Sequence, residues 1–214
     1  MPVERIREAI KCGLTEFGEN RVQEVEEKFA MTDMEANEAI DNGKVARSNI
    51  TLHLIGNLQR NKARQAVELF DCIQSVDRVG LVHVLDKSYV GSPGRQKLHI
   101  FMQVNLTGEE SKSGVSPANL PKLADSVMAS NNVQGVGLMT IARFGADERE
   151  LRHTFATLRS LLDDLRHSHS ADWTELSMGM SDDYEVAIEE GATIIRLGRA
   201  LFGARNTSTT EAIC

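Results

Sequence analysis

Residues 173–205 read W-T-E-L-S-M-G-M-S-D-D-Y-E-V-A-I-E-E-G-A-T-I-I-R-L-G-R-A-L-F-G-A-R and predict two consecutive strand–loop–helix units. In the first unit, Thr174–Met180 is an apolar run typical of a strand. Residues 181–183 then offer serine and aspartate side chains as the N-cap of a helix, because such side chains accept hydrogen bonds from first-turn N–H groups. In the second unit, Thr193–Leu197 predicts a strand, and Gly198 opens a last short helix.

Strands and helices alternate in the same way along the rest of the chain. This alternation predicts parallel strands joined by right-handed crossovers. The strands are continuous apolar runs, as expected when both faces of a sheet are buried. Predicted strands cover 14–18, 51–55, 72–76, 98–106 (the longest) and 133–140, and predicted helices cover 3–10, 21–30, 58–70, 79–89, 117–129 and 147–167. Residues 31–50 predict a helix tail and a surface excursion, 91–94 a turn, and 107–114 a polar loop.

The number and order of these elements favour a closed barrel over an open, doubly wound sheet. The pattern contains seven strands and eight helices, and a helix comes first. No G-x-G-x-x-G follows an early strand, which weakens the case for a dinucleotide-binding fold. We therefore predict a (β/α)8 barrel of the TIM type whose first strand is missing from this chain. Residues 1–214 are expected to form a single domain, with 206–214 as a flexible tail.

Composition limits the compartment and the partners. The formal net charge of −7 argues against a nucleic acid or an anionic membrane as the main partner. No apolar run approaches the roughly 18 residues of a membrane span, and the N-terminal M-P-V-E-R-I-R lacks the apolar core of a signal peptide. Cys12, Cys72 and Cys214 show no metal-ligand spacing and fit reduced cytosolic thiols. We expect a cytoplasmic protein without a metal site.

Candidate chemistry lies where strands end, because the carboxyl ends of the strands carry the active site of a barrel. Ser181 is either a phosphate ligand or a plain N-cap, and its spacing alone favours the N-cap. Arg196 either pairs with a carboxylate of the barrel or is a deliberately placed buried guanidinium. His53 fits a satisfied core histidine better than a general base, and Asn20 can cap the helix that follows it. The basic run 59–64 could contact phosphates, but it fits a solvated helix face better.

Six segments of the chain carry the motifs of one known family. They are F-G-E-N-R-V-Q-E at 17–24, H-L-I-G-N-L-Q-R-N-K at 53–62, G-E-E-S-K-S-G at 108–114, G-L-M-T-I at 137–141, S-M-G-M-S-D-D at 177–183 and R-L-G-R-A-L-F-G-A-R at 196–205. They cover nearly the whole chain and fall in the family's order. On these motifs, the sequence resembles the pyridoxal 5′-phosphate (PLP) homeostasis proteins, which are similar to the barrel domain of alanine racemase.

The resemblance implies a PLP site at the carboxyl ends of the strands. Ser181 and the backbone around Gly198 and Arg199 match the residues that hold the phosphate. Arg196 matches the partner of the pyridine nitrogen, where an arginine keeps the ring unprotonated because it does not give up its own proton. The remaining matches, which line the edge and face of the cofactor, are Asn20, His53 and Met180. The resemblance implies no catalytic residue.

The sequence departs from the family at two places. The family's Schiff-base lysine lies in a strand-end motif of the type S-K-T, and alignment on F-G-E-N places that lysine just before Met1. We therefore expect PLP to bind here only through its phosphate and ring, and the neighbours of the absent strand to expose unpaired edges. At position 199 this chain has Arg where relatives carry a small hydroxyl residue.

The function implied by the resemblance is intracellular PLP homeostasis. Such a protein holds the cofactor and delivers it to PLP-dependent apo-enzymes without turning over a substrate, and we expect it to be a monomer. A racemase or decarboxylase of the same barrel type is an alternative, but it would need a second domain with residues that face the cofactor. A barrel enzyme that binds phosphate without using PLP is a third class.

Overall fold

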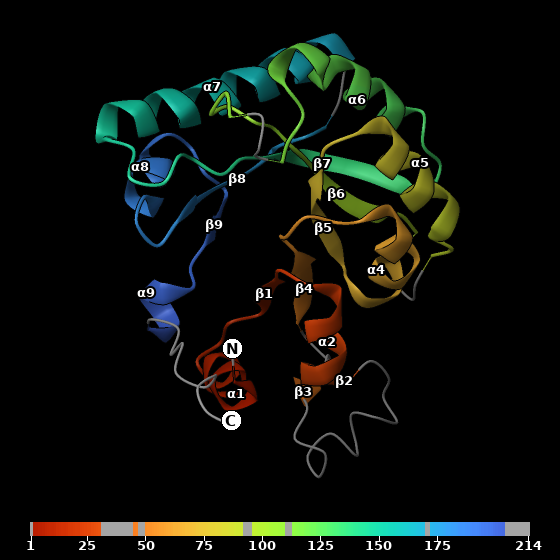
Figure 1. Cartoon of the computed structure of the whole chain (residues 1–214), viewed down its shortest axis with the longest axis vertical. Coiled ribbons are helices and arrows are strands. Elements are labelled where there is room, and N and C mark those ends of the chain that lie inside the picture. The colour runs from red at the N-terminus through yellow and green to blue at the C-terminus, as the bar shows by residue number, and fades with distance from the viewer. Residues whose placement is uncertain are drawn as a thin grey trace, which may run out of the picture.

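The main sheet consists of seven parallel strands that follow one another in chain order (Figure 1). The computed structural model describes residues 2–30, 45–46, 50–91, 96–109, 113–169 and 172–203. All six neighbouring pairs in the sheet are parallel. In sheet order, the strands are β1 (Glu16–Glu19), β4 (Thr51–Leu54), β5 (Cys72–Val76), β6 (Leu98–Gln103), β7 (Val133–Met139), β8 (Glu175–Met180) and β9 (Ile194–Arg196).

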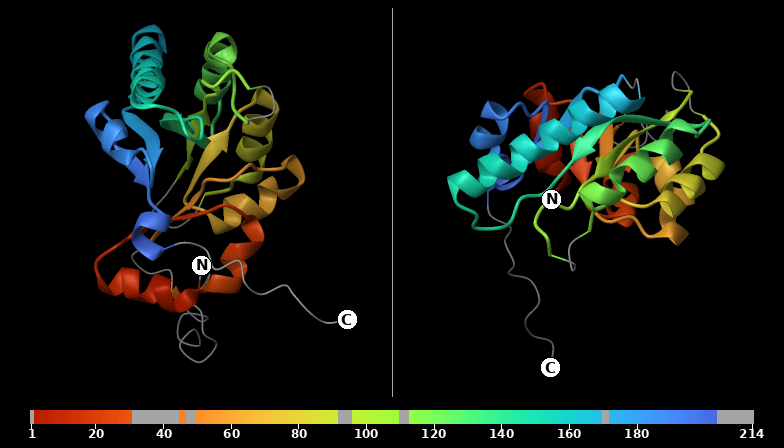
Figure 2. Two further views of the ribbon diagram at one scale, coloured as in Figure 1. Left: turned by 60° about the vertical axis from the view of Figure 1, so that its left-hand side comes forward. Right: turned by 90° about the horizontal axis from the view of Figure 1, so that it is seen from above.

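Helices alternate with the strands, and most of them cover the outer face of this sheet (Figure 2). They are α1 (Val3–Lys11), α2 (Val22–Lys28), α4 (Ala63–Leu69), α5 (Val79–Ser88), α6 (Leu120–Met128), α7 (Glu148–His169), α8 (Tyr184–Glu189) and α9 (Arg199–Phe202). Short 3₁₀ turns, η1 (Arg60–Lys62) and η2 (Pro117–Asn119), lead into α4 and α6. In the described part of the chain, no helix combines the length and apolar character that a membrane crossing requires.

The sheet forms a nearly closed barrel with one open side. Within the described residues, β1 pairs only with β4, and β9 pairs only with β8. The sheet order shows none of the reversal that characterises a doubly wound fold. An eight-stranded barrel would carry one more strand between β1 and β9. The predicted barrel lacking one strand is therefore confirmed, and we refer to the side between β1 and β9 as the open seam.

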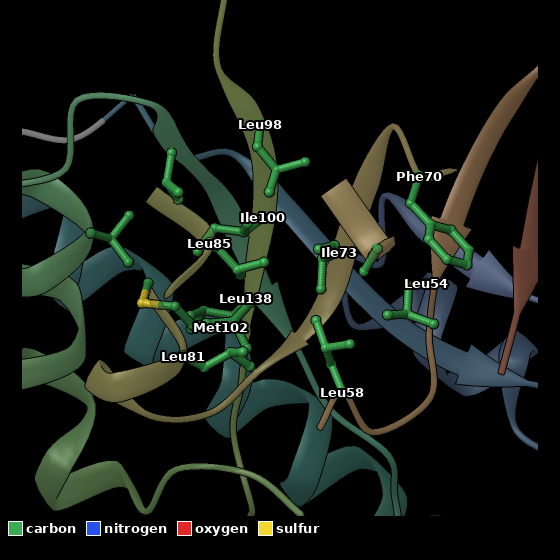
Figure 3. Packing of buried hydrophobic residues seen from close by; sticks show 14 of the residues in the cluster. Leu54, Leu58, Phe70, Ile73, Leu81, Leu85, Leu98, Ile100, Met102 and Leu138 are labelled. Atoms are coloured by element: carbon green, nitrogen blue, oxygen red, sulfur yellow. The ribbon is translucent and has the colours of Figure 1, made fainter. Parts of the chain in front are cut away.

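Apolar side chains pack on both faces of the sheet, since successive residues of a strand point to opposite faces. The larger cluster lies between the sheet and its helices and includes fully buried Leu54, Ile73, Leu98, Ile100 and Leu138 (Figure 3). Residues that alternate with these form a separate, smaller cluster on the inner face, namely Cys72, Phe101 and Met139 with Val136 and Ile194. The inner face is thus only partly apolar, which leaves room for the polar groups described below.

Several predicted bounds differ from the structure by a few residues, and two of these differences have a structural reason. The strand predicted over 98–106 ends at Gln103, and β7, with seven residues, is longer than β6, with six. The ladder stops there because Asn105 N donates to Val115 O, and Val115 N donates to Gln103 O. The helix predicted to reach Ala30 ends at Lys28, and β2 (Phe29–Ala30) pairs with β3 (Val45–Ala46). Most of 31–50 and 91–94, and part of 107–114, lie outside the described residues.

A buried ion pair fixes α2 to β1 at the open seam. Lys28 Nζ donates to Glu19 Oε1 at 2.9 Å and to Glu24 Oε2 at 2.8 Å. The side chains of Lys28 and Glu19 are each 10% exposed. Burial raises the pKa of Glu19, whereas the hydrogen bond from Lys28 lowers the pKa of Glu24. Burial disfavours the Lys28 ammonium, but its hydrogen bonds to Glu24 and Glu19 outweigh that effect and raise its pKa.

Lys28→Met should lower the free energy of unfolding by about 3 kcal/mol at neutral pH, because it leaves a buried Glu19 charge without a partner. The loss should shrink in acid for two reasons. In the variant, the unpaired Glu19 takes up a proton. In the wild type, the lowered pKa of Glu24 stabilises the fold at pH values above the pKa of Glu24 in the unfolded chain, and this contribution is lost as the pH falls through the pKa of the folded state. Urea denaturation at neutral pH and at a series of pH values down to below 4.5, the ordinary pKa of Glu24, measures both effects.

The matched control is Arg5→Met, which breaks the exposed Arg5–Glu8 pair, whose side chains are 61% and 63% exposed. An exposed pair contributes about 1 kcal/mol or less. A loss for Lys28→Met no larger than that of the control, or one that grows in acid, would contradict this role of the buried pair.

Candidate functional site

The loops that follow β8 and β9 meet at the carboxyl end of the barrel. Ser181 Oγ accepts a hydrogen bond from Ala200 N at 3.2 Å. The Arg199 guanidinium donates to the Asp182 carboxylate, and both side chains are 59% exposed. The structure thus brings together three of the residues predicted from the sequence, namely Ser181, Gly198 and Arg199.

Ser181 does not cap the helix that follows it. The N-cap of α8 is Asp183, and its side chain makes no capping bond to that helix. Asp183 Oδ1 instead accepts from Met180 N at 2.5 Å, within a tight turn closed by Asp183 N donating to Met180 O. This turn directs the Ser181 hydroxyl toward the first turn of α9. The N-cap interpretation of Ser181 is therefore wrong.

Gly198 leaves open space in front of the first turn of α9. It is the N-cap of that helix with φ −111° and ψ −72°, and a Cβ added to it would meet no atom within 4 Å. Within the described residues, the N–H groups of Gly198 and Arg199 donate to no acceptor. We call Ser181 Oγ and these two N–H groups the anion site, because free N–H groups at a helix start favour an anion.

Arg196, the last residue of β9, is half-buried and lies two residues before Gly198. Its Nη1 donates to Ser177 Oγ at 2.6 Å, and its Nη2 donates to the Thr140 carbonyl at 2.7 Å. Burial lowers the pKa of the guanidinium to about 10, although the nearby Asp183 acts in the opposite direction. The group still carries its charge at neutral pH. Both acceptors are neutral, so the alternative of an ion pair with a carboxylate of the barrel is wrong for the described residues.

A chain of hydrogen bonds, buried in its middle, continues from Arg196 across the barrel to the exposed side chain of Glu16. The Ser177 hydroxyl donates to Gln74 Oε1 at 2.7 Å, Gln74 Nε2 contacts His53 Nδ1 at 3.0 Å, and His53 Nε2 contacts Glu16 Oε2 at 2.5 Å. We refer to Arg196, Ser177, Gln74, His53 and Glu16 as the polar chain. Both ring nitrogens of His53 have partners, as a satisfied core histidine requires.

Asn20 and Met180 also lie at the carboxyl ends of their strands. Asn20 follows β1 and is exposed, but it does not cap α2, whose N-cap is Arg21 without a side-chain hydrogen bond. Its backbone packs closely on the next loop, since a Cβ added to Gly56 would lie 2.1 Å from Asn20 O. Met180 is paired in register with Arg196 and is 36% exposed. The predicted capping role of Asn20 is therefore wrong.

A cavity of about 580 Å³ lies at the opposite end of the barrel. Its lining includes the first residues of several strands, among them Glu16, Thr51, Cys72 and Ile194, and it also includes His53. The polar chain therefore runs from the strand carboxyl ends to this cavity. The residues described contain no group of three or more His, Cys, Asp or Glu side chains arranged to hold a metal ion.

Sequence reasoning missed Gln74 and Ser177, which are 1% and 0% exposed. Each lies in the middle of an apolar strand, in C-I-Q-S-V at 72–76 and E-L-S-M-G-M at 175–180. A polar residue at such a position is a usable signal, because a buried polar side chain needs a hydrogen-bond partner. The partner itself cannot be read from one strand.

A nearly closed barrel of parallel strands, with an anion site and a buried arginine after its last two strands, defines a barrel of the alanine racemase type. The family described as "Alanine racemase, N-terminal domain" matches residues 2–206. The pyridoxal phosphate homeostasis protein of Aquifex aeolicus is 40% identical over 206 residues, which cover 96% of this chain and 83% of that relative. The chain belongs to the family of pyridoxal phosphate homeostasis proteins.

Solved structures show the same relationship. The structure of PipY from Synechococcus elongatus PCC7942 with PLP bound has a TM-score of 0.77 at 40% identity, and the match covers 94% of this chain and 88% of that one. An alanine racemase of Clostridium difficile has a TM-score of 0.68 at 11% identity, covering 96% of this chain and 49% of that one, and it supports the fold alone. The resemblance inferred from the motifs is confirmed.

Arg196→Lys should lower the free energy of unfolding by about 2 kcal/mol. A lysine ammonium lacks the rigid fork that serves Ser177 Oγ and the Thr140 carbonyl together, so one buried acceptor loses its donor. Thermal or urea denaturation measures the loss. Arg199→Lys, at the exposed pair with Asp182, is the control and should change stability by about 0.5 kcal/mol or less. Equal losses for the two variants would contradict the buried role of Arg196.

Proposed function

We propose that this chain binds PLP at the carboxyl ends of β8 and β9 and serves PLP homeostasis. The observation that carries the proposal is the arrangement of Ser181 Oγ, the free N–H groups of α9 and the Arg196 guanidinium after two neighbouring strands. This set offers hydrogen-bond donors for a phosphate and a fixed cation for a ring nitrogen. The names of the relatives and the PLP in the PipY structure support the same ligand.

Each predicted residue has a role in this proposal. Ser181 and the backbone N–H groups of Gly198 and Arg199 hold the phosphate, because they are donors that the described residues leave available. Arg196 donates to the pyridine nitrogen and keeps it unprotonated, since the guanidinium holds its own proton at neutral pH. The residues proposed to line the cofactor are Asn20, His53 and Met180.

The Arg196 contact favours holding the cofactor over turning over a substrate. PLP supplies an aldehyde that reacts with amines and a ring that acts as an electron sink in PLP enzymes. A ring whose nitrogen stays unprotonated is a weaker electron sink. We therefore propose that this protein holds PLP and delivers it to PLP-dependent apo-enzymes without catalysing a reaction of its own.

Arg199 contributes less to phosphate binding than its charge suggests. Its guanidinium donates to Asp182, so part of its charge is balanced by that carboxylate. The pair lies beside Ser181, because Asp182 is the next residue along the chain. On this account, the phosphate is held mainly by backbone N–H groups and by the Ser181 hydroxyl.

No described lysine follows a barrel strand at its carboxyl end. The described lysines lie in helices, or at the amino end of a strand in the case of Lys97, and they are Lys11, Lys28, Lys62, Lys87, Lys97 and Lys122. Borohydride added to the PLP-loaded chain should therefore leave none of these six lysines modified. Peptide mass spectrometry checks this, and a pyridoxyl group on any of them after reduction at stoichiometric PLP would contradict the proposed site.

A PLP titration followed by absorbance tests the proposal. Gly198→Val should weaken binding by about tenfold or more, equivalent to at least about 1.4 kcal/mol, because the new side chain fills the open space in front of the N–H groups. The φ of Gly198 is negative, so no left-handed backbone conformation reserves this position for glycine.

Gly80→Val is the matched control, because Gly80 lies on α5 and its added Cβ would meet nothing closer than 3.9 Å. This variant should bind PLP like the wild type. Absence of a spectral change on adding PLP to the wild type, or racemisation of an amino acid above background in a parallel assay, would overturn the proposal.

A further inference from the structure

We infer that Ser177 and Gln74 are positioning residues that fix the direction of the Arg196 guanidinium and so set how it meets the ring nitrogen of PLP. The inference rests on the proposed function and adds two residues to it. The observation is one continuous run of hydrogen bonds through five strands, from Arg196 on β9 to Glu16 on β1.

Every bond of the polar chain can point in the same direction. Arg196 can only donate, so the Ser177 oxygen accepts from it and the Ser177 hydroxyl donates onward to Gln74 Oε1. The Gln74 amide then presents its NH₂ group to His53 Nδ1, which must accept. His53 is thereby held as the Nε2–H tautomer and donates to the Glu16 carboxylate. A cation at one end and an anion at the other reinforce this single direction.

The two central residues of the polar chain, Ser177 and Gln74, are fully buried. Ser177 is 0% exposed and Gln74 is 1% exposed, so water does not replace a lost partner there. Ser177 and Gln74 each donate and accept one bond within the chain, and no other partner of either side chain is present among the described residues. Removing either side chain therefore leaves its neighbour without a fixed direction.

The bond from Arg196 to Ser177 determines where the remaining N–H donors of Arg196 point. A guanidinium has five N–H donors, and among the described residues the bonds to Ser177 and to the Thr140 carbonyl use two of them, which leaves three. Two bonds from different nitrogens fix the plane of the group, and the plane sets where the three remaining donors point. Loss of the Ser177 bond frees the plane to rotate about the bond to Thr140.

The test uses the full chain with PLP labelled with ¹⁵N at the ring nitrogen, because this nucleus reports whether the nitrogen accepts a hydrogen bond. Ser177→Ala and Gln74→Met are the variants, and Thr154→Val is the control. Thr154 is 8% exposed and, among the residues that the structure describes, its hydroxyl is bonded only within α7, so the control also loses a buried hydroxyl.

In the wild type and the control, we expect the same ¹⁵N shift, typical of an unprotonated nitrogen that accepts a hydrogen bond. Both variants should move this shift. Ser177→Ala should weaken PLP binding by about tenfold, the effect of one bond to a charged group, and Gln74→Met, which keeps the bond from Arg196 to Ser177, should weaken it less. A purely structural role would lower the melting temperature and leave the ¹⁵N shift of the bound cofactor in place, which would overturn the inference.

A measurement on the wild type without PLP tests the direction of the polar chain even if the variants do not fold. In ¹⁵N-histidine-labelled wild type, His53 should give the Nε2–H tautomer, and the Nδ1–H tautomer would overturn the direction of the polar chain. The proposed function and the positioning role of Ser177 and Gln74 can be contradicted by different results. If the wild type binds no PLP, both the proposed function and this role are contradicted. If the wild type binds PLP and the variants show the same ¹⁵N shift and affinity, this role alone is contradicted.

Discussion

A charged guanidinium inside the barrel is the constraint on which the described site depends. Taking such a charge out of water is costly unless it finds partners. Arg196 finds a hydroxyl and a backbone carbonyl, both neutral, and although Asp183 lies nearby, no ion pair within the described residues cancels the charge. The barrel therefore keeps a fixed positive group near the carboxyl ends of its last two strands. An uncancelled cation beside free N–H groups favours an electron-rich ligand that carries both a phosphate and a basic nitrogen.

The barrel separates two environments that the polar chain connects. At the carboxyl ends of the strands lie the anion site and Arg196, and at the amino ends lies the cavity that Glu16 and His53 line. The polar chain also crosses from β9 to β1, the two strands that border the open seam. The same five side chains thus connect the proposed PLP site with the two strands at the open seam.

The sequence predicted the parallel barrel because its signals are local. Apolar runs, glycines and capping residues in each unit specify one strand and one helix, and strict alternation then leaves few topologies. The site was predicted only in part. Ser181 was expected to cap α8, and only the fold shows that its hydroxyl faces α9. The polar chain joins residues up to 103 positions apart, as in Ser177 and Gln74, so no local pattern contains it.

The central claim is that Ser181, the first turn of α9 and Arg196 bind one molecule of PLP. A crystal structure of this chain with PLP tests it most directly. The account predicts the phosphate within hydrogen-bonding distance of Ser181 Oγ and of the Gly198 and Arg199 N–H groups, with the ring nitrogen facing Arg196. PLP seated in the cavity at the amino ends of the strands, or a ring nitrogen turned away from Arg196, would contradict it.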